Sequence, residues 1–178
     1  MTIMFKIGHQ GKANKSSNLY RVILYKRPCE ALDTQDPIWI VLRSFYSIAG
    51  TGVDCVYDKV TSNSGNEYQL EHGYRYEGHV KKGTLLGTAG QKGTESYLDV
   101  RETEGHGKNR HFLKYWNKDK KCFILSFQNR TSGQTQCQLH LWAQSVSTTS
   151  GFSCEEKYDV ICGETKHKVY TSDCPTPQ

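Results

Sequence analysis

The sequence predicts an all-β protein, an eight-stranded antiparallel barrel with one C-terminal helix packed outside it and disulfide bonds as staples. From residue 38 onward, short runs of alternating apolar and polar residues are separated by turn-forming residues. No helical pattern interrupts these runs before residue 153, and consecutive hairpins without crossover helices favour an antiparallel barrel or sandwich. Seven cysteines in 178 residues, five of them between residues 122 and 174, indicate a disulfide framework.

Eight strand-like runs and one helix can be placed along the chain. The predicted strands are residues 38–46, 53–60, 67–76, 79–88, 96–102, 110–116, 121–127 and 137–144. The predicted helix covers 153–163, with Ser153 as N-cap, glutamates in its first turn and Gly163 just past its end. A closed barrel of eight strands encloses room for one small ligand.

The last strand, CQLHLW at residues 137–142, indicates which side chains face the barrel interior. Alternation sends the cysteine and two leucines to one face and the other three residues to the opposite face. Because the helix packs outside and carries two cysteines, the strand cysteines that bond to it must face outward. The residues predicted to point inward on the last two strands are Phe123, Leu125, Phe127, Gln138, His140 and Trp142.

The sixth strand has two possible phases. Phe112, Lys114 and Trp116 form one set, and Leu113 and Tyr115 form the other. We include Phe112 and Lys114 among the expected pocket residues. The resulting pocket is aromatic with a few polar groups, as small-ligand sites generally are. The alternative is that these aromatic residues are only the core of a small barrel.

The charge distribution argues against a nucleic-acid partner. The chain has 23 basic and 18 acidic residues, and residues 1–32 hold six of the basic residues against one acidic residue. The rest of the chain is therefore formally neutral, whereas nucleic-acid binding calls for a basic face on the folded body. No run approaches the roughly 18 apolar residues of a membrane span. We expect a monomer with no membrane partner.

The cysteine pattern favours an oxidising compartment and thus a secreted protein. There is no CxxC pair, which argues against a structural zinc site. The N-terminus shows no apolar segment of the kind found in signal peptides. Sequons occur at Asn14 and Asn129, and Asn129, in a predicted turn, is the candidate glycosylation site.

The sequence shows no catalytic motif. It lacks a glycine-rich phosphate loop, GxSxG and HExxH, and bridging six cysteines leaves no credible cysteine nucleophile. We therefore expect a binding protein with no catalytic residues, no metal and no cofactor.

Four segments together resemble one family: KKCFILSF, CQLHLW, CEEKYDVICG and VYTSDC, preceded by PIWIVLRSF and DCVYDKV. They resemble the tick salivary lipocalins, which include the histamine-binding proteins, over about residues 36–174. The resemblance implies a lipocalin barrel with disulfides Cys55–Cys174, Cys122–Cys154 and Cys137–Cys162. It also implies that Trp39 lies in the pocket.

The resemblance implies that the protein sequesters a host inflammatory mediator, a biogenic amine such as histamine or serotonin. The family's amine-binding signature carries acidic residues at positions that are Phe123, Gln138 and His140 here. Another carboxylate would have to serve, and Asp99, Glu102 and Glu67 are the candidates. One alternative is a lipid mediator, a leukotriene or fatty acid, whose carboxylate would meet Arg43, Lys114 or His140. The other is a protein–protein inhibitor acting through the barrel loops.

The N-terminal part departs from the family. Residues 1–35 are basic, contain the odd Cys29 and show little of the helix that family members carry before the first strand. We expect residues 1–35 to be a poorly ordered segment and residues 36–178 to form the barrel.

Overall fold

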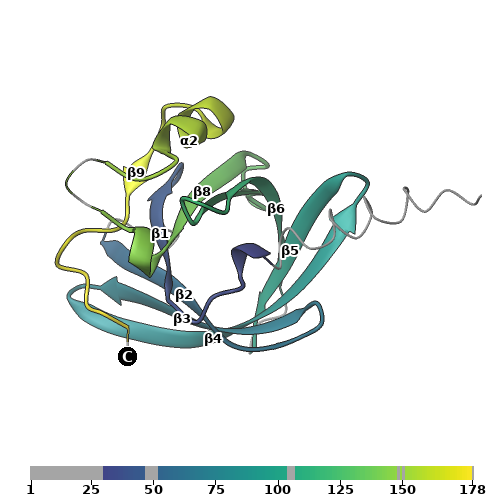
Figure 1. Cartoon of the computed structure of the whole chain (residues 1–178), viewed down its shortest axis with the longest axis horizontal. Helices are drawn as coiled ribbons and strands as arrows, with labels where there is room; N and C mark the ends of the chain where they lie inside the picture. The colour runs from purple at the N-terminus through teal and green to yellow at the C-terminus, as the bar shows by residue number, and fades with distance from the viewer. Residues whose placement is uncertain (1–29, 47–51, 104–106, 148, 150, 178) are drawn as a thin grey trace, which may run out of the picture.

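The computed structural model describes residues 30–46, 52–103, 107–147, 149 and 151–177. Eight antiparallel strands close into a barrel, seen along its axis in Figure 1. The strands are β1 Ile38–Arg43, β2 Val53–Ser64, β3 Glu67–Tyr76, β4 His79–Lys92, β5 Glu95–Glu102, β6 Lys108–Asn117, β7 Cys122–Gln128 and β8 Thr135–Trp142. Each pairs with the next along the chain, and β1 pairs with both β8 and β2, which closes the barrel. The predicted fold class is confirmed.

The alternation of each strand divides the buried side chains into two groups. An inner cluster fills the lumen and includes Ile38, Leu70, Leu98, Phe123 and Leu125. A separate outer cluster covers the wall of β7, β8 and β1 and includes Ile124, Leu139, Leu141 and Tyr158. Two cores, one on each side of the same wall, explain why β7 and β8 are buried on both faces.

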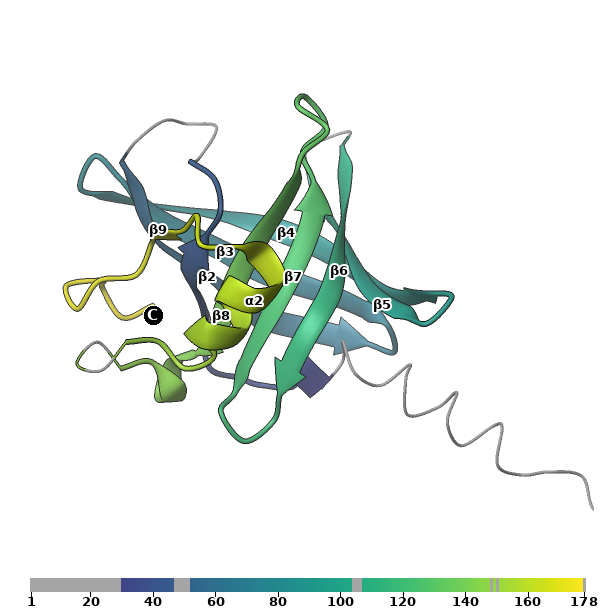
Figure 2. The same cartoon turned by 90° about the horizontal axis from the view of Figure 1, so that it is seen from above.

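The helix α2, Glu155–Cys162, lies outside the barrel across β8 and β7 (Figure 2). Its Tyr158 is fully buried against the wall. Gly163 ends the helix with a φ of 82°, the backbone conformation that glycine adopts readily. The prediction that Ser153 caps the helix is wrong. Cys154 occupies that position in a left-handed conformation, and no side chain caps the first turn.

Three disulfides join the barrel to the C-terminal third of the chain. Cys122 bonds to Cys154 and Cys137 to Cys162, which fixes both ends of α2 to the strands beneath it. The third disulfide, Cys55–Cys174, ties the C-terminal segment to β2. All three are the pairings that the family resemblance implied.

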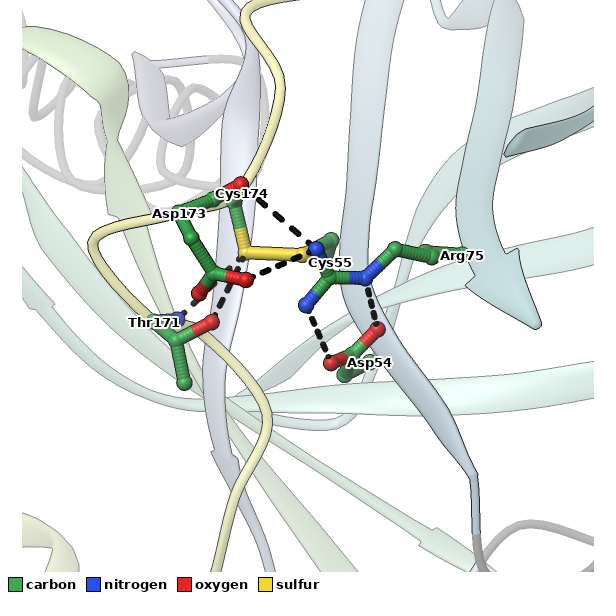
Figure 3. The surroundings of a disulfide bond; sticks show 6 residues. All are labelled: Asp54, Cys55, Arg75, Thr171, Asp173 and Cys174. Atoms are coloured by element: carbon green, nitrogen blue, oxygen red, sulfur yellow. Dashed lines mark hydrogen bonds and ion pairs between the residues drawn. A yellow bond between two sulfur atoms is a disulfide. The ribbon is translucent and has the colours of Figure 1, made fainter. Parts of the chain in front are cut away.

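The third disulfide lies within a network of ion pairs (Figure 3). Arg75 of β3 donates two hydrogen bonds to the carboxylate of Asp54, at 2.8 and 2.6 Å. The same guanidinium donates to Asp173 at 2.9 Å. The arginine thus bridges β2 and the C-terminal segment beside the Cys55–Cys174 bond.

A short strand that the sequence did not predict follows α2. Strand β9, His167–Lys168, pairs with the end of β1. Beyond it, Val169 accepts a hydrogen bond from the N–H of Cys55 at 2.8 Å and donates one to the carbonyl of Val41 at 3.0 Å. Val169 thereby bridges β1 and β2 where these two strands separate, five residues before the Cys174 that bonds to Cys55.

Residues 30–35 close one end of the barrel. Ala31 and Leu32 are 2% and 6% exposed, and they pack with the inner cluster. The indole N–H of Trp142 donates to the carbonyl of Ala31 at 2.9 Å. The expectation of a poorly ordered segment therefore fails for residues 30–35. The same expectation for residues 1–29, which include Asn14 and Cys29, lies outside the described residues.

A candidate ligand site in the barrel lumen

The lumen contains a cavity of about 110 Å³. It is mostly apolar, with four polar side chains among the residues that line it. The lining residues are Leu32, Ile38, Asp58, Leu70, Leu85, Leu98, Val100, His111, Phe123, Leu125, Gln138 and His140. A cavity of roughly 150 Å³ holds a benzene molecule. This one is smaller, so even a ligand with one ring would require side chains to move.

The carboxylate of Asp58 is the acidic group of the cavity. Asp58 lies opposite His72 in the β2–β3 register, and Nδ1 of His72 is 2.7 Å from Oδ1 of Asp58. Burial alone would raise the pKa of Asp58, but the hydrogen bond and charge of His72 hold it below its ordinary value. Burial lowers the pKa of His72, yet the Asp58 carboxylate outweighs it and the net shift is upward. The wall of β2 and β3 therefore presents a carboxylate that stays ionised.

His140 forms a second polar element of the cavity. Its ring is stacked on Phe123 with centroids 4.6 Å apart and planes 7° apart. Burial lowers the pKa of His140 to about 4, so the imidazole is neutral near pH 7. Among the described residues, neither ring nitrogen has a hydrogen-bond partner. A neutral imidazole has one donor and one acceptor, so the cavity holds two unused hydrogen-bonding positions.

His111 of β6 adds a further polar atom. Its side chain lines the same cavity, and its Nδ1 has no partner within the described part of the chain. Burial lowers the pKa of His111 as well. Two neutral imidazoles and one paired carboxylate thus face a small space that is otherwise apolar.

Of the six inward residues predicted on the last two strands, five belong to the inner cluster or line the cavity, and the sixth, Phe127, packs against the ring of His111, with centroids 4.7 Å apart. Phe123, Leu125, Gln138 and His140 line the cavity. Trp142 points inward too but closes the end of the barrel against Ala31, and its ring packs 5.8 Å from that of Trp116. Contact of these residues with a ligand stays a prediction.

The expected inward position of Trp39 is wrong. Trp39 lies opposite Leu141 in the β1–β8 register, and both belong to the outer cluster. Its ring packs edge-on against Tyr57 and Tyr170, at 5.4 and 5.0 Å between centroids. Its neighbour Ile38 occupies the lumen instead. The C-terminal segment, which carries Tyr170, provides the outer pocket that buries the indole.

The expected inward positions of Phe112 and Lys114 are also wrong. Leu98 pairs with His111 inside the lumen, so Phe112, paired with Tyr97, lies on the outer face. A bulge between Leu113 and Tyr115 then shifts the phase of β6. His111 and Leu113 face the lumen before the bulge, and Trp116 faces it after the bulge, three residues further on instead of two or four. Lys114 forms an ion pair with Glu95.

Of the carboxylates that the sequence suggested, none lines the cavity. Asp99 is on the outer face of β5, where Arg110 and Lys108 hold it and keep its pKa below the ordinary value. Glu67 and Glu102 are exposed, and neither lines the cavity. Asp58 was missed, and alternation along β2 from Cys55 is no safe guide to it, because the register shifts between Asp54 and Tyr57.

Of the three groups suggested for a lipid carboxylate, Arg43 and Lys114 do not line the cavity, and His140, which does, is neutral near pH 7. Arg43 is buried beyond it, donates to the carbonyl of Val53 at 3.0 Å and lies over the ring of Phe45. No lysine or arginine occurs among the described residues that line the cavity. The electrostatics of the site thus favour a cationic ligand over an anionic one.

A wider hollow of about 640 Å³ lies outside the closed end. Its walls include Tyr68, Trp116 and Trp142, and its charged residues are Glu30, Asp33, Lys118 and Lys121. The ammonium of Lys121 lies 4.5 Å from the centre of the Trp142 ring. The charges of this hollow balance, whereas the described residues that line the lumen cavity include a carboxylate and no lysine or arginine, so the lumen cavity is the better candidate site for a cation.

Two other kinds of site receive no support from the described residues. Within them, no group of three or more histidine, cysteine, aspartate or glutamate side chains is arranged to hold a metal ion. No helix of the described ranges has the length and apolarity needed to cross a membrane.

A closed eight-stranded barrel with an outer helix and a small, mostly apolar lumen that holds a few polar groups defines a lipocalin-type ligand-binding protein. The family described as tick histamine binding protein matches residues 29–176, and the chain belongs to that family. No curated protein sequence matches it significantly.

Two solved structures show the same fold. Japanin from Rhipicephalus appendiculatus bound to cholesterol has a TM-score of 0.54 and 12% identity, covering 78% of this chain and 94% of its own. The serotonin complex of AM182 has a TM-score of 0.60 and 13% identity, covering 83% of this chain and 92% of its own. Both are complexes with a small molecule, and at these identities the likeness concerns the fold.

Proposed function

We propose that this protein binds and sequesters a small cationic amine with one ring, such as histamine, inside the barrel lumen. The observation that carries the proposal is Asp58, an ionised carboxylate in the wall of an otherwise apolar cavity. An ammonium group taken from water needs such a partner, because unpaired burial of a charge is costly. Membership of the tick histamine-binding family supports the same ligand class.

The rest of the cavity fits the ring of such an amine. The rings of Phe123 and His140 are stacked face to face in the lining of the cavity, and the aromatic ring of a ligand can extend this stack. A ring N–H or hydroxyl would meet the unpartnered nitrogens of His140 and His111. The size of the cavity disfavours a leukotriene or sterol, and a two-ring amine such as serotonin would require larger side-chain movements than a one-ring amine.

Sequestration requires affinity and abundance rather than turnover, and the lumen offers no nucleophile aligned with a base. We propose that the protein acts outside the cell, where its three disulfides would persist. Asn129 lies in the β7–β8 turn, where its Oδ1 accepts from the N–H of Thr131 at 2.8 Å, and it remains the proposed glycosylation site.

The test is a calorimetric titration of the oxidised protein and of the Asp58→Asn variant with histamine, tyramine, serotonin and arachidonic acid. Removing one partner of a buried ion pair costs about 3–5 kcal/mol, so we expect Asp58→Asn to weaken amine binding at least a hundredfold. Asp119→Asn, in an exposed turn, is the matched control and should bind as the wild type does. Arachidonic acid binding without any amine response would refute the proposal.

A further inference from the structure

We propose that capture of a cationic amine at Asp58 expels a proton from His72, so that binding exchanges one cation for another on the same carboxylate and weakens in acid. This inference rests on the proposed function and concerns how the site is regulated.

The geometry shows that the position beside the carboxylate is already occupied. Nδ1 of His72 is 2.7 Å from Oδ1 of Asp58, and the two residues are direct partners in the β2–β3 register. Their side chains are 29% and 18% exposed, so the pair is largely withdrawn from water. An ammonium group that enters the cavity must therefore share Asp58 with the imidazolium of His72.

The groups that face this pair come from several strands. His111 on β6 and His140 on β8 line the same cavity, and Glu102 near the end of β5 adds negative charge that favours the protonated form of His72. On β3 the ring of Tyr74 lies 5.9 Å from that of His72. On β4 the residue opposite His72 is Gly83, which places no side chain there, and the uncharged Ile38 of β1 lies opposite Asp58.

These neighbours leave His72, beside the cavity, as the histidine whose protonation the surroundings favour. Asp58 and Glu102 raise its pKa above the ordinary histidine value. Burial lowers the pKa of His111 and brings that of His140 to about 4, so both stay neutral where His72 gains its proton. Protonation of His72 is therefore the event that changes the charge of the empty site.

A bound ammonium group weakens the electrostatic attraction that holds the proton on His72. It neutralises the Asp58 carboxylate and adds a like charge beside His72, and both effects lower the pKa of the imidazole. Protonated His72 then loses H⁺ to the solvent as the amine enters, and the neutral ring can keep its Nδ1–H donated to Asp58. The net charge of the site is the same before and after capture, which avoids an uncompensated buried charge.

The sign of the pH dependence follows from these shifts. His72 has a higher pKa in the free protein than in the complex, so the free protein holds more protons and acid favours the empty state. Affinity should be constant above the free-protein pKa of His72 and should fall as the pH drops through it, approaching tenfold per pH unit. Proton release should peak between the two pKa values.

The experiment is calorimetric titration of the full-length oxidised protein with tyramine, whose charge is constant from pH 5.5 to 8. Titrations in phosphate and in Tris, which differ in ionisation enthalpy, give the number of protons released. His72→Gln keeps an N–H donor for Asp58 but cannot titrate, so we expect it to bind tyramine without proton release and with a flat pH profile. His79→Gln, an exposed histidine on β4, is the matched control and should keep the wild-type behaviour.

The outcomes separate this inference from the proposed function. Tyramine binding with equal heats in both buffers, or proton release that persists in His72→Gln, would overturn the inference alone. Absence of any amine binding would overturn the proposed function and this inference with it. Should His72→Gln fail to fold, an NMR titration of His72 in the wild type, with and without tyramine, decides the matter: an unchanged pKa refutes the exchange.

Discussion

The ring of His140 lies flat on that of Phe123, 4.6 Å away and 7° from parallel, and both side chains are almost completely buried in the lumen. The sequence resemblance implied that acidic side chains of an amine site stand at these positions in the family. In the site proposed for this protein the carboxylate is Asp58 on β2, which is separated from β8 by β1 alone. The two stacked rings add a neutral imidazole whose nitrogens have no partner among the described residues.

Burial of neutral His140 should make the fold sensitive to acid. Its pKa of about 4 in the folded state lies below the unfolded value of 6.5, so this contribution to stability is complete above the unfolded value and is lost as the pH falls toward 4. Between pH 7 and 5 the loss should be about 2 kcal/mol. We expect His140→Phe, which keeps the stacking, to lack this loss when urea unfolding is measured at both pH values. An equal loss in wild type and variant would show that His140 is not the group responsible.

The unpartnered nitrogens of His140 and His111 should make the site prefer amines with a polar ring substituent. Tyramine and 2-phenylethylamine differ only by a hydroxyl group, and one neutral hydrogen bond contributes about 0.5–1.5 kcal/mol. We therefore expect tyramine to bind roughly tenfold more tightly, and His140→Phe to reduce that ratio. Competition titrations measure the ratio directly. Equal affinities in the wild type would mean that neither imidazole contacts the ring substituent.

The sequence predicted correctly which side chains face the lumen on strands where the alternation is unbroken and a disulfide shows which face points outward. Cys122 and Cys137 face outward toward α2, and from them the lumen residues of β7 and β8 follow correctly. On β6 the bulge between Leu113 and Tyr115 changes the phase within one strand, which periodicity alone does not reveal.

The misplacement of Trp39 has a different cause. An indole suits the lumen and the outer cluster equally well by hydrophobicity, and the outer cluster exists because Tyr170 and the rest of the C-terminal segment fold back over β1. The pairing of Asp58 with His72, 14 residues apart, likewise depends on the β2–β3 register, which two bulges adjust. Local sequence specifies the strands, whereas these contacts between distant segments decide which side chains meet.

Gly73 leaves room for a tyrosine ring on the neighbouring strand. A Cβ at Gly73 would lie 2.1 Å from the ring of Tyr57, whose hydroxyl donates to Glu71 at 2.7 Å. We expect Gly73→Ala to destabilise the protein by about 1–3 kcal/mol, because the ring must shift and the hydrogen bond is strained. Gly83→Ala, at a site with open space, should change the free energy of unfolding by no more than about 0.5 kcal/mol. Similar effects of both variants in urea unfolding would contradict this account.

The disulfide that closes the longest loop should stabilise the fold most. Cys55–Cys174 spans 119 residues, whereas Cys137–Cys162 spans 25. In the chain-entropy treatment this difference corresponds to roughly 1.4 kcal/mol.

Replacing Cys55 and Cys174 by serine should also free the segment that carries Val169 and Tyr170, which exposes the outer face of Trp39. We therefore expect the Cys55→Ser/Cys174→Ser variant to unfold at lower urea concentration than Cys137→Ser/Cys162→Ser, with red-shifted tryptophan emission before the main transition. If the order is reversed, attachment of α2 matters more to stability than closure of the longest loop.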